Sequence, residues 1–199
     1  MPRATSRPKR QRNAVATRQA ILQSARQAFA KAGYAGAGVR EIASGAGVTA
    51  MLVNRYFGSK ERLFAEAVAE SMATTSVLAP QIASAGISGK EIAAALVGIT
   101  KANATPLEGF QIMLRSAASP SAARIGREQI EWHHHKRIAA ALPGPFAAER
   151  AGVMLSLIAG FQLMRQMLEV RALTKADART LVKVLAPLFD QLLARDGHA

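Results

Sequence analysis

Apolar residues recur every three or four positions along much of this chain, which is the spacing of an amphipathic helix. The first such segment places Ile21, Ala25 and Phe29 on one side, and we expect Thr17 to cap it and Gly33 to end it. No alternating strand pattern or hairpin-turn dipeptide interrupts the later segments. The pattern predicts an all-α protein of about nine helices: an N-terminal three-helix domain and a larger C-terminal helical bundle.

Capping residues predict where the later helices begin. Three starts pair a serine or threonine with an acid three residues later, as in a capping box: Ser88 with Glu91, Thr105 with Glu108, and Thr174 with Asp177. Ser119-Pro120 predicts a further helix that runs through Trp132 to about Leu142. A long apolar helix should follow over residues 146–170. The last helix, over residues 174–195, contains Pro187, which should kink it.

Two adjacent helical segments, residues 39–45 and 49–57, are too short to be stable alone. Gly47 lies in the tight turn between them, where it can adopt positive φ, and Val48 can fill the angle between the helices. Packed on the first helix, the pair would form a helix-turn-helix. Its second helix would be free to enter a DNA major groove.

The string Gly-Ser-Lys-Glu at residues 58–61 favours a phosphate contact. Ser59 should cap the next helix, and Lys60 would add a positive charge to a helix N-terminus that already attracts anions. Tyr56 could offer its hydroxyl to a second phosphate while Phe57 packs inside. The alternative is that Tyr56 and Phe57 are both core residues and that Lys60 is simply solvated.

Charge is concentrated where this motif lies. The net charge is +13, and residues 1–62 hold 12 Lys and Arg against two acids, a net of +10. Residues 1–16 have no hydrophobic periodicity and predict a disordered basic arm that includes Arg10 and Arg12. A basic module joined to a nearly neutral one indicates nucleic-acid binding.

Residues 17–64 resemble the DNA-binding domain of the TetR family of bacterial transcriptional regulators. The resemblance rests on Gly33-Tyr34 at the end of the first helix, on the turn "VREIASGAGV", and on "YFGSKERLF". It implies a homodimer whose helical C-terminal domain binds a small effector and releases operator DNA. Three positions depart from the family pattern, namely Gly38, Met51 and Asn54, and they leave the base preference unreadable.

These arguments give domain boundaries and a set of DNA contacts. We expect an arm over residues 1–16, a helix-turn-helix domain over 17–62, and an effector-binding and dimerisation domain over 63–199. The expected DNA-binding residues are Arg10, Arg12, Arg40, Thr49, Ala50, Met51, Asn54, Arg55, Tyr56 and Lys60.

The last two helices carry apolar stripes wider than one neighbour can cover. A four-helix bundle formed by two chains would cover them and would give the two-fold symmetry that a palindromic operator requires, although a buried pair within a monomer is the alternative. The expected dimer contacts are Leu157, Met164, Leu181, Leu185, Leu188 and Leu192.

An effector pocket is expected among the middle helices, although core packing is the stronger reading of any single one of its residues. They are Met72, Phe110, Met113, Trp132, Phe161 and Gln162. Three consecutive histidines, 133–135, cannot converge on one metal ion, because neighbouring helical residues point about 100° apart. The sequence shows no catalytic constellation, so we expect no enzyme activity, no metal site and no cofactor.

The predicted function is therefore a ligand-responsive transcriptional regulator, a repressor released from a palindromic operator by an apolar effector. Two alternatives remain open, a sequence-neutral architectural DNA-binding protein and a small-molecule carrier. The chain has no cysteine, no apolar run as long as a membrane span and no secretory signal pattern, so we expect a cytoplasmic protein.

Overall fold

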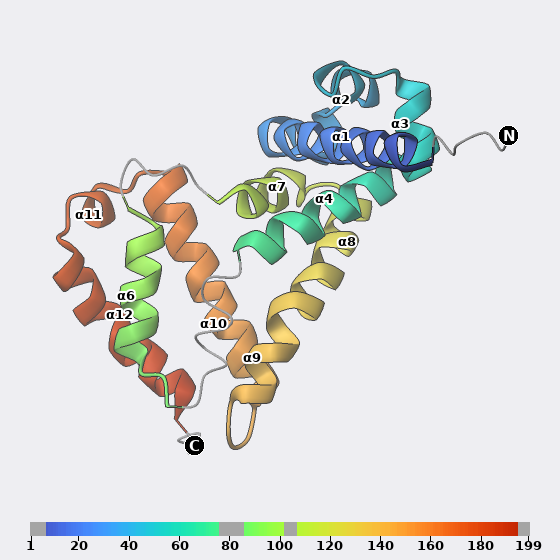
Figure 1. Cartoon of the computed structure of the whole chain (residues 1–199). Coiled ribbons are helices and arrows are strands. Elements are labelled where there is room, and N and C mark those ends of the chain that lie inside the picture. The colour runs from blue at the N-terminus through green and yellow to red at the C-terminus, as the bar shows by residue number, and fades with distance from the viewer. Residues whose placement is uncertain (1–6, 76–85, 102–106, 195–199) are drawn as a thin grey trace, which may run out of the picture. The chain divides into compact units, whose positions relative to one another are not determined.

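The computed structural model describes residues 7–75, 86–101 and 107–194, and within these ranges the chain forms only helices and connecting turns. The prediction of an all-α fold is confirmed. The chain divides into two compact units (Figure 1). Unit 1 contains residues 1–71 and 111–127, and unit 2 contains residues 72–110 and 128–199.

Unit 1 begins with four helices, α1 (Arg7–Gly36), α2 (Val39–Gly45), α3 (Ala50–Phe57) and α4 (Lys60–Thr75). It also holds most of α7 (Glu108–Ser116) and α8 (Pro120–Ile130). Unit 2 holds α6 (Gly89–Ile99), η1 (Glu131–His135), α9 (Lys136–Ala141), α10 (Ala147–Gln162), η2 (Leu163–Met167), α11 (Arg171–Thr174) and α12 (Ala178–Leu193). The segment η1 is a π-helical turn between α8 and α9, and η2 is a π-helical turn that follows the end of α10.

The start of α1 corrects two predictions. The helix begins at Arg7, so most of the expected disordered arm is helical. Thr17 is not a cap, because its hydroxyl donates to the Asn13 carbonyl inside the helix at 2.8 Å. Pro8 lies in the first turn, where a missing N–H costs nothing, and the residues after it are mostly strong helix formers.

The core of unit 1 is built on one face of α1. Ile21, Leu22 and Phe29 are buried, and α2 packs against α1. Phe64 on α4 meets Phe29 edge-on at a ring-centroid distance of 5.0 Å, and Tyr34 lies equally close to Phe64. Such aromatic pairs add to the stability that area burial supplies. This core holds the two short helices in place.

Residues 111–127 also belong to unit 1. Gly33 has φ 67° and ψ 179°, and an added Cβ there would lie 2.4 Å from the Arg115 carbonyl oxygen. The Tyr34 amide donates to the Ser116 hydroxyl at 2.9 Å. The end of α7 therefore packs on the end of α1, a long-range contact that sequence periodicity does not reveal.

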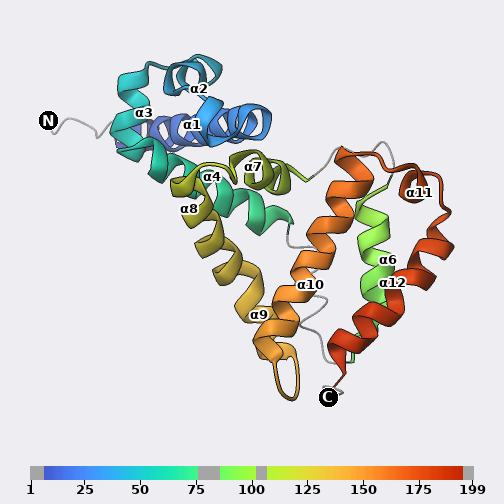
Figure 2. The ribbon, with the colours of Figure 1, turned by 180° about the vertical axis from the view of Figure 1, so that it is seen from behind.

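Unit 2 packs α6, α9, α10 and α12 around an apolar core (Figure 2). Ser88 caps α6 and forms the predicted capping box with Glu91. The expected cap Thr174 is wrong, because Asp177 caps α12 by accepting from the Thr180 amide at 2.9 Å. Thr105, the third expected cap, lies outside the described residues. Pro187 lies inside α12, which remains one helix.

Candidate nucleic-acid interface

The turn between α2 and α3 has the geometry that the sequence predicted. Gly47 has φ 67°, and the Val48 amide donates to the Ala43 carbonyl at 2.9 Å. Thr49 caps α3 by accepting from the Leu52 amide at 3.3 Å. The Ser24 hydroxyl of α1 donates to the Ile42 carbonyl at 2.8 Å and so fixes α2 on α1. These bonds make a helix-turn-helix held by the core of unit 1.

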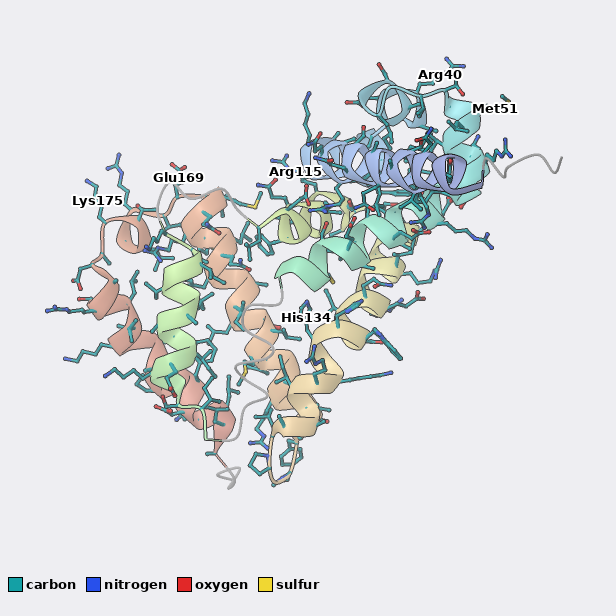
Figure 3. The ribbon with its side chains drawn as sticks, viewed as in Figure 1. Arg40, Met51, Arg115, His134, Glu169 and Lys175 are labelled. Atoms are coloured by element: carbon teal, nitrogen blue, oxygen red, sulfur yellow. The ribbon has the colours of Figure 1, made fainter. Side chains whose placement is uncertain are left out.

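Helix α3 divides cleanly into a buried and an exposed face. Val53 and Phe57 are buried in the core, whereas Asn54 and Arg55 are exposed and Met51 is 80% exposed. Figure 3 shows Met51 on α3 and Arg40 on α2 extending away from α1. A methionine this exposed at a helix start contributes nothing to the core, so the free face of α3 is available to a partner.

Lys60 lies at the first position of α4, and Ser59 caps that helix through a bond from the Arg62 amide at 3.2 Å. The Lys60 ammonium sits over the Tyr34 ring, 4.7 Å from its centroid. The Tyr34 hydroxyl in turn donates to a Glu61 carboxylate oxygen at 2.7 Å. Tyr34 thus holds the lysine at the helix N-terminus, a role that the sequence pattern did not reveal.

The same contact sets the local electrostatics. The hydrogen bond from Tyr34 lowers the pKa of Glu61, which stays ionised. Burial, with the neighbouring Glu61 carboxylate, raises the pKa of Tyr34, so its hydroxyl stays protonated and can donate. Lys60 is thereby kept between a ring face and a helix N-terminus, a cationic position suited to a phosphate.

The structure brings together most of the predicted DNA-binding residues. Thr49, Met51, Asn54 and Arg55 share the exposed part of the helix-turn-helix, with Ala50 and Tyr56 half-buried beside them and Arg40 exposed on α2. Phe57 is a core residue, as expected. The side chains of Arg10 and Arg12 lie outside the described residues, although both positions are within α1.

Two family models match the chain over these units. Residues 21–67 match the model of bacterial regulatory proteins of the TetR family, and residues 87–193 match the tetracyclin repressor-like C-terminal domain. The second match alone spans more than half of the sequence. The chain belongs to the TetR family. It is a DNA-binding transcriptional regulator.

Solved structures of other proteins share this fold. A TetR-family regulator from Streptomyces coelicolor A3 is 22% identical, with 96% of this chain and 99% of that chain covered and a TM-score of 0.61. A transcriptional regulator from Rhodococcus sp. Rha1 is 21% identical, with 86% and 94% covered and a TM-score of 0.61. The multidrug binding protein EbrR complexed with ethidium is 18% identical, with 86% and 98% covered and a TM-score of 0.63. No curated protein matches the sequence.

The residues expected to line an effector pocket are only partly brought together. Met72, Phe161 and Gln162 are buried in unit 2, and Phe110 of the same unit is half-buried. Met113 belongs to unit 1, where its thioether lies against Gly126. Trp132 is 68% exposed, with the Lys136 ammonium 5.2 Å from its ring centroid. A π turn shifts the phase of the helix at that point and directs this ring to solvent.

The histidine triplet lies within the same π turn. His135 Nε2 bonds to the Ala148 carbonyl at 2.9 Å, and burial lowers the pKa of His134. Within the described residues, no group of three His, Cys, Asp or Glu side chains could hold a metal ion. The same part of the chain has no helix with the length and apolar character that crossing a bilayer requires.

The surfaces of α10 and α12 correct part of the expected dimer interface. Leu181 and Leu185 are buried in the core of unit 2, because α6 packs on that face of α12. Leu157 and Leu192 are half-buried, and Met164 and Leu188 are exposed. Exposed apolar residues that the prediction missed extend this surface. We call the exposed set the apolar stripe: Val153, Met164, Leu168, Val184 and Leu188.

Proposed function

We propose that this TetR-family protein is a repressor that binds a palindromic operator as a homodimer and leaves it when a small effector binds. The exposed face of α3 supports the proposed operator binding. Met51, Asn54 and Arg55 are exposed on a helix whose opposite face is locked into the core. Lys60 lies at the next helix N-terminus, where it would contact phosphate.

The buried side-chain amide of Gln162 supports the proposed effector binding. Gln162 is 5% exposed, and its side-chain nitrogen has no hydrogen-bond partner among the described residues. An unpaired buried donor costs free energy, and an effector that accepted its hydrogen bond would remove that cost. The solved structure of EbrR with ethidium shows that a protein of this fold binds a planar organic compound. We therefore assign three buried residues of unit 2, Gln162, Phe161 and Met72, to the effector site.

The apolar stripe supports the homodimer. Val153 lies on α10, Met164 on η2 and Leu168 directly after η2. Val184 and Leu188 lie one turn apart on α12. Exposed apolar residues at helical spacing on two neighbouring helices favour packing against the same two helices of a second chain. A two-fold dimer would present two copies of α3 to successive major grooves of a palindrome.

Helix α4 supplies a route between effector and DNA. It starts at Lys60 in the DNA-binding unit and continues to Thr75, beyond the buried Met72. A ligand that shifts α4 would move Lys60 as well. Allosteric coupling of about 1–3 kcal/mol would weaken operator binding about 5–150-fold, and the operator would weaken effector binding by the same factor.

A reciprocal titration tests the repressor model. An operator fragment is selected from genomic DNA, and a panel of aromatic and apolar compounds is screened for binding to the protein with and without that fragment. We expect at least one compound to bind more weakly when operator is present. The same compound should weaken operator binding by the same factor. Compounds that bind equally well in both states would refute the switch while leaving DNA binding intact.

A matched pair of variants tests the assignment of Gln162. Gln162→Leu should weaken binding of that compound about tenfold or more, because a buried hydrogen-bond donor is lost, while operator affinity without the compound is unchanged. Gln191→Leu, at an exposed position on α12, is the control and should change neither affinity. Equal effector affinity for wild type and Gln162→Leu would contradict the assignment.

The dimer is tested separately by sedimentation equilibrium. Val184→Glu places a charge in the apolar stripe and should convert the dimer to a monomer. Val15→Glu makes the same exchange at an exposed valine of α1 and should leave the dimer intact. A wild-type monomer, or a dimer that tolerates Val184→Glu, would contradict the proposed interface.

A further inference from the structure

Unit 2 contains a groove that lies between α6 and α12, with η2 at its base. These two helices lie side by side in both views (Figures 1 and 2). The groove has a volume of about 830 Å³ and is lined by residues of α6, η2 and α12. We call it the α6–α12 groove. Its volume falls within the range of small-molecule sites in proteins.

One end of the groove is closed by a tight contact. The Gly89 amide donates to the Asp190 carboxylate at 2.7 Å, and an added Cβ on Gly89 would lie 2.3 Å from the Ala186 carbonyl oxygen. The N-terminus of α6 therefore meets the C-terminal part of α12, and the two helices run antiparallel. Asp190 lines the groove, and its carboxylate already accepts the hydrogen bond from the Gly89 amide.

Arg165 lies at the base of the groove and is 6% exposed. Its Nη1 donates to the Val97 carbonyl at 2.9 Å and to the Thr100 hydroxyl at 3.1 Å. Its Nε–H is buried and has no hydrogen-bond partner among the described residues, and none of their carboxylates forms an ion pair with it. A guanidinium stays charged in a protein, so this is a buried cation without a counterion, which is an unfavourable arrangement on its own.

The backbone that presents Arg165 is unusual. The residue is in the middle of η2, a π-helical turn of Leu163–Met167 that follows α10. A π turn changes the direction of the side chains that follow it, and such turns occur frequently at functional sites. The turn directs the arginine towards α6 and into the base of the groove.

Further cations flank the groove. Lys101 follows the C-terminus of α6, and Arg179 and Lys183 lie one turn apart at the start of α12. Since the helices are antiparallel, Lys101 and Arg179 share the Arg165 end of the groove. In the part of the chain that the structure describes, no carboxylate lies within ion-pair distance of any of these side chains. Between them the surface is apolar, formed by Ala94, Val182 and Ala186.

We propose that the α6–α12 groove binds an amphipathic organic carboxylate, with its head at Arg165, Lys101 and Arg179 and its apolar part along Ala94, Val182 and Ala186. A guanidinium pairs with a carboxylate through two parallel hydrogen bonds. The buried Arg165 would bind the carboxylate together with its exposed neighbours Lys101 and Arg179. The apolar lining favours an alkyl or aryl carboxylate over an inorganic anion. Gln162, Phe161 and Met72 do not line the groove, although the Arg165 guanidinium carbon lies 5.7 Å from the centroid of the Phe161 ring. The proposal does not depend on the repressor proposal, because it needs no DNA.

Isothermal titration calorimetry with the purified full-length protein tests this site. Decanoate is the probe, acetate tests the head group alone, and decyltrimethylammonium tests the apolar part with the opposite charge. We expect decanoate to bind at least about tenfold more tightly than either control, since each lacks one half of the recognition. Equal binding of the cationic and anionic compounds, or no binding of decanoate, would overturn the proposal.

Two sets of variants connect the binding to these residues. Arg165→Met should weaken decanoate binding about tenfold or more, because the charge-assisted bonds are lost. Since a buried residue could affect folding, the double variant Lys101→Gln/Arg179→Gln changes only exposed groups and should also weaken binding. Lys175→Gln, at an exposed lysine outside the groove (Figure 3), removes one positive charge and should have no effect. Weakening by Lys175→Gln equal to that in the double variant would show a general charge effect and overturn the site.

A last arm separates a small carboxylate from a lipid surface. Vesicles of phosphatidylglycerol present the same combination of negative charge and apolar chain. We expect decanoate to bind in the absence of vesicles and to be unaffected by them at low lipid concentration. Vesicle binding that requires Arg165, without binding of free decanoate, would overturn the small-molecule assignment.

Discussion

We expect alanine at Gly33 to destabilise unit 1 by about 2–6 kcal/mol, through two separate effects. Gly33 has φ 67° and ψ 179°, a backbone conformation that is essentially restricted to glycine and costs other residues about 1–3 kcal/mol. The new Cβ would also lie 2.4 Å from the Arg115 carbonyl oxygen. Because that atom is backbone, α7 or the end of α1 must move, and overpacking of this kind costs about 1–3 kcal/mol.

Two other glycines separate these effects. Gly47 also has φ 67°, but no heavy atom lies within 4 Å of its added Cβ, so Gly47→Ala should cost only the strain, about 1–2 kcal/mol. Gly38 has φ −88° and open space, and Gly38→Ala should cost less than about 1 kcal/mol as a poorer helix cap.

Native-state hydrogen exchange of the buried α1 amides of Ile21 and Phe29 measures the stability of unit 1 without a contribution from unit 2. The predicted order of destabilisation is Gly33→Ala, then Gly47→Ala, then Gly38→Ala. If Gly33→Ala cost no more than Gly47→Ala, the close approach of α7 to α1 would contribute nothing. The packing that defines unit 1 would then be wrong.

Two further predictions concern charge. Lys60→Ala should lower the slope of log affinity against log salt by about one per subunit and weaken binding equally on all DNA sequences, as measured by fluorescence anisotropy over a salt series; a changed sequence preference would refute the phosphate contact. Because burial lowers the pKa of His134, the unfolded chain binds more protons than the folded one below the ordinary histidine pKa of about 6.5, so stability should fall as the pH drops from about 7.5 to about 5.5. In urea titrations His134→Gln should lose less stability over that range than wild type, and an identical loss would contradict the neutral state of the half-buried His134 side chain.

The features that the sequence predicted correctly depend on local chemistry. Thr49, Ser59 and Ser88 each cap the helix that they precede, and Gly47 has the positive φ that its turn requires. A cap or a turn is decided by a few neighbouring residues, so its signal is present in the sequence itself. The helix-turn-helix could be located for this reason.

The errors arose where a distant neighbour decides the outcome. The apolar stripes of α12 were assigned to a second chain, but Leu181 and Leu185 face α6 of the same chain. Periodicity gives the direction of a side chain around its helix and does not say which element covers it. The π turns at residues 131–135 and 163–167 changed that direction, which placed Trp132 in solvent and Arg165 in the interior. No local pattern in the sequence marks either turn.

Tyr34 shows a different limit of sequence reasoning. It could be read as the residue after a helix-ending glycine, but its contacts to Lys60 and Glu61 join positions about 27 residues apart. These two contacts depend on the packing of α4 on α1, which the local sequence does not predict.

Sequence-selective DNA binding by the free face of α3 is the central claim, and a competition experiment tests it most directly. Genomic fragments that the protein retains are sequenced to define a palindrome, and its affinity is then measured against a shuffled duplex of equal length at one fixed salt concentration. We expect the palindrome to be preferred by about 10³-fold or more. Equal affinity for both duplexes would indicate a sequence-neutral DNA coater, and no affinity for either would indicate a carrier; both results would contradict the account.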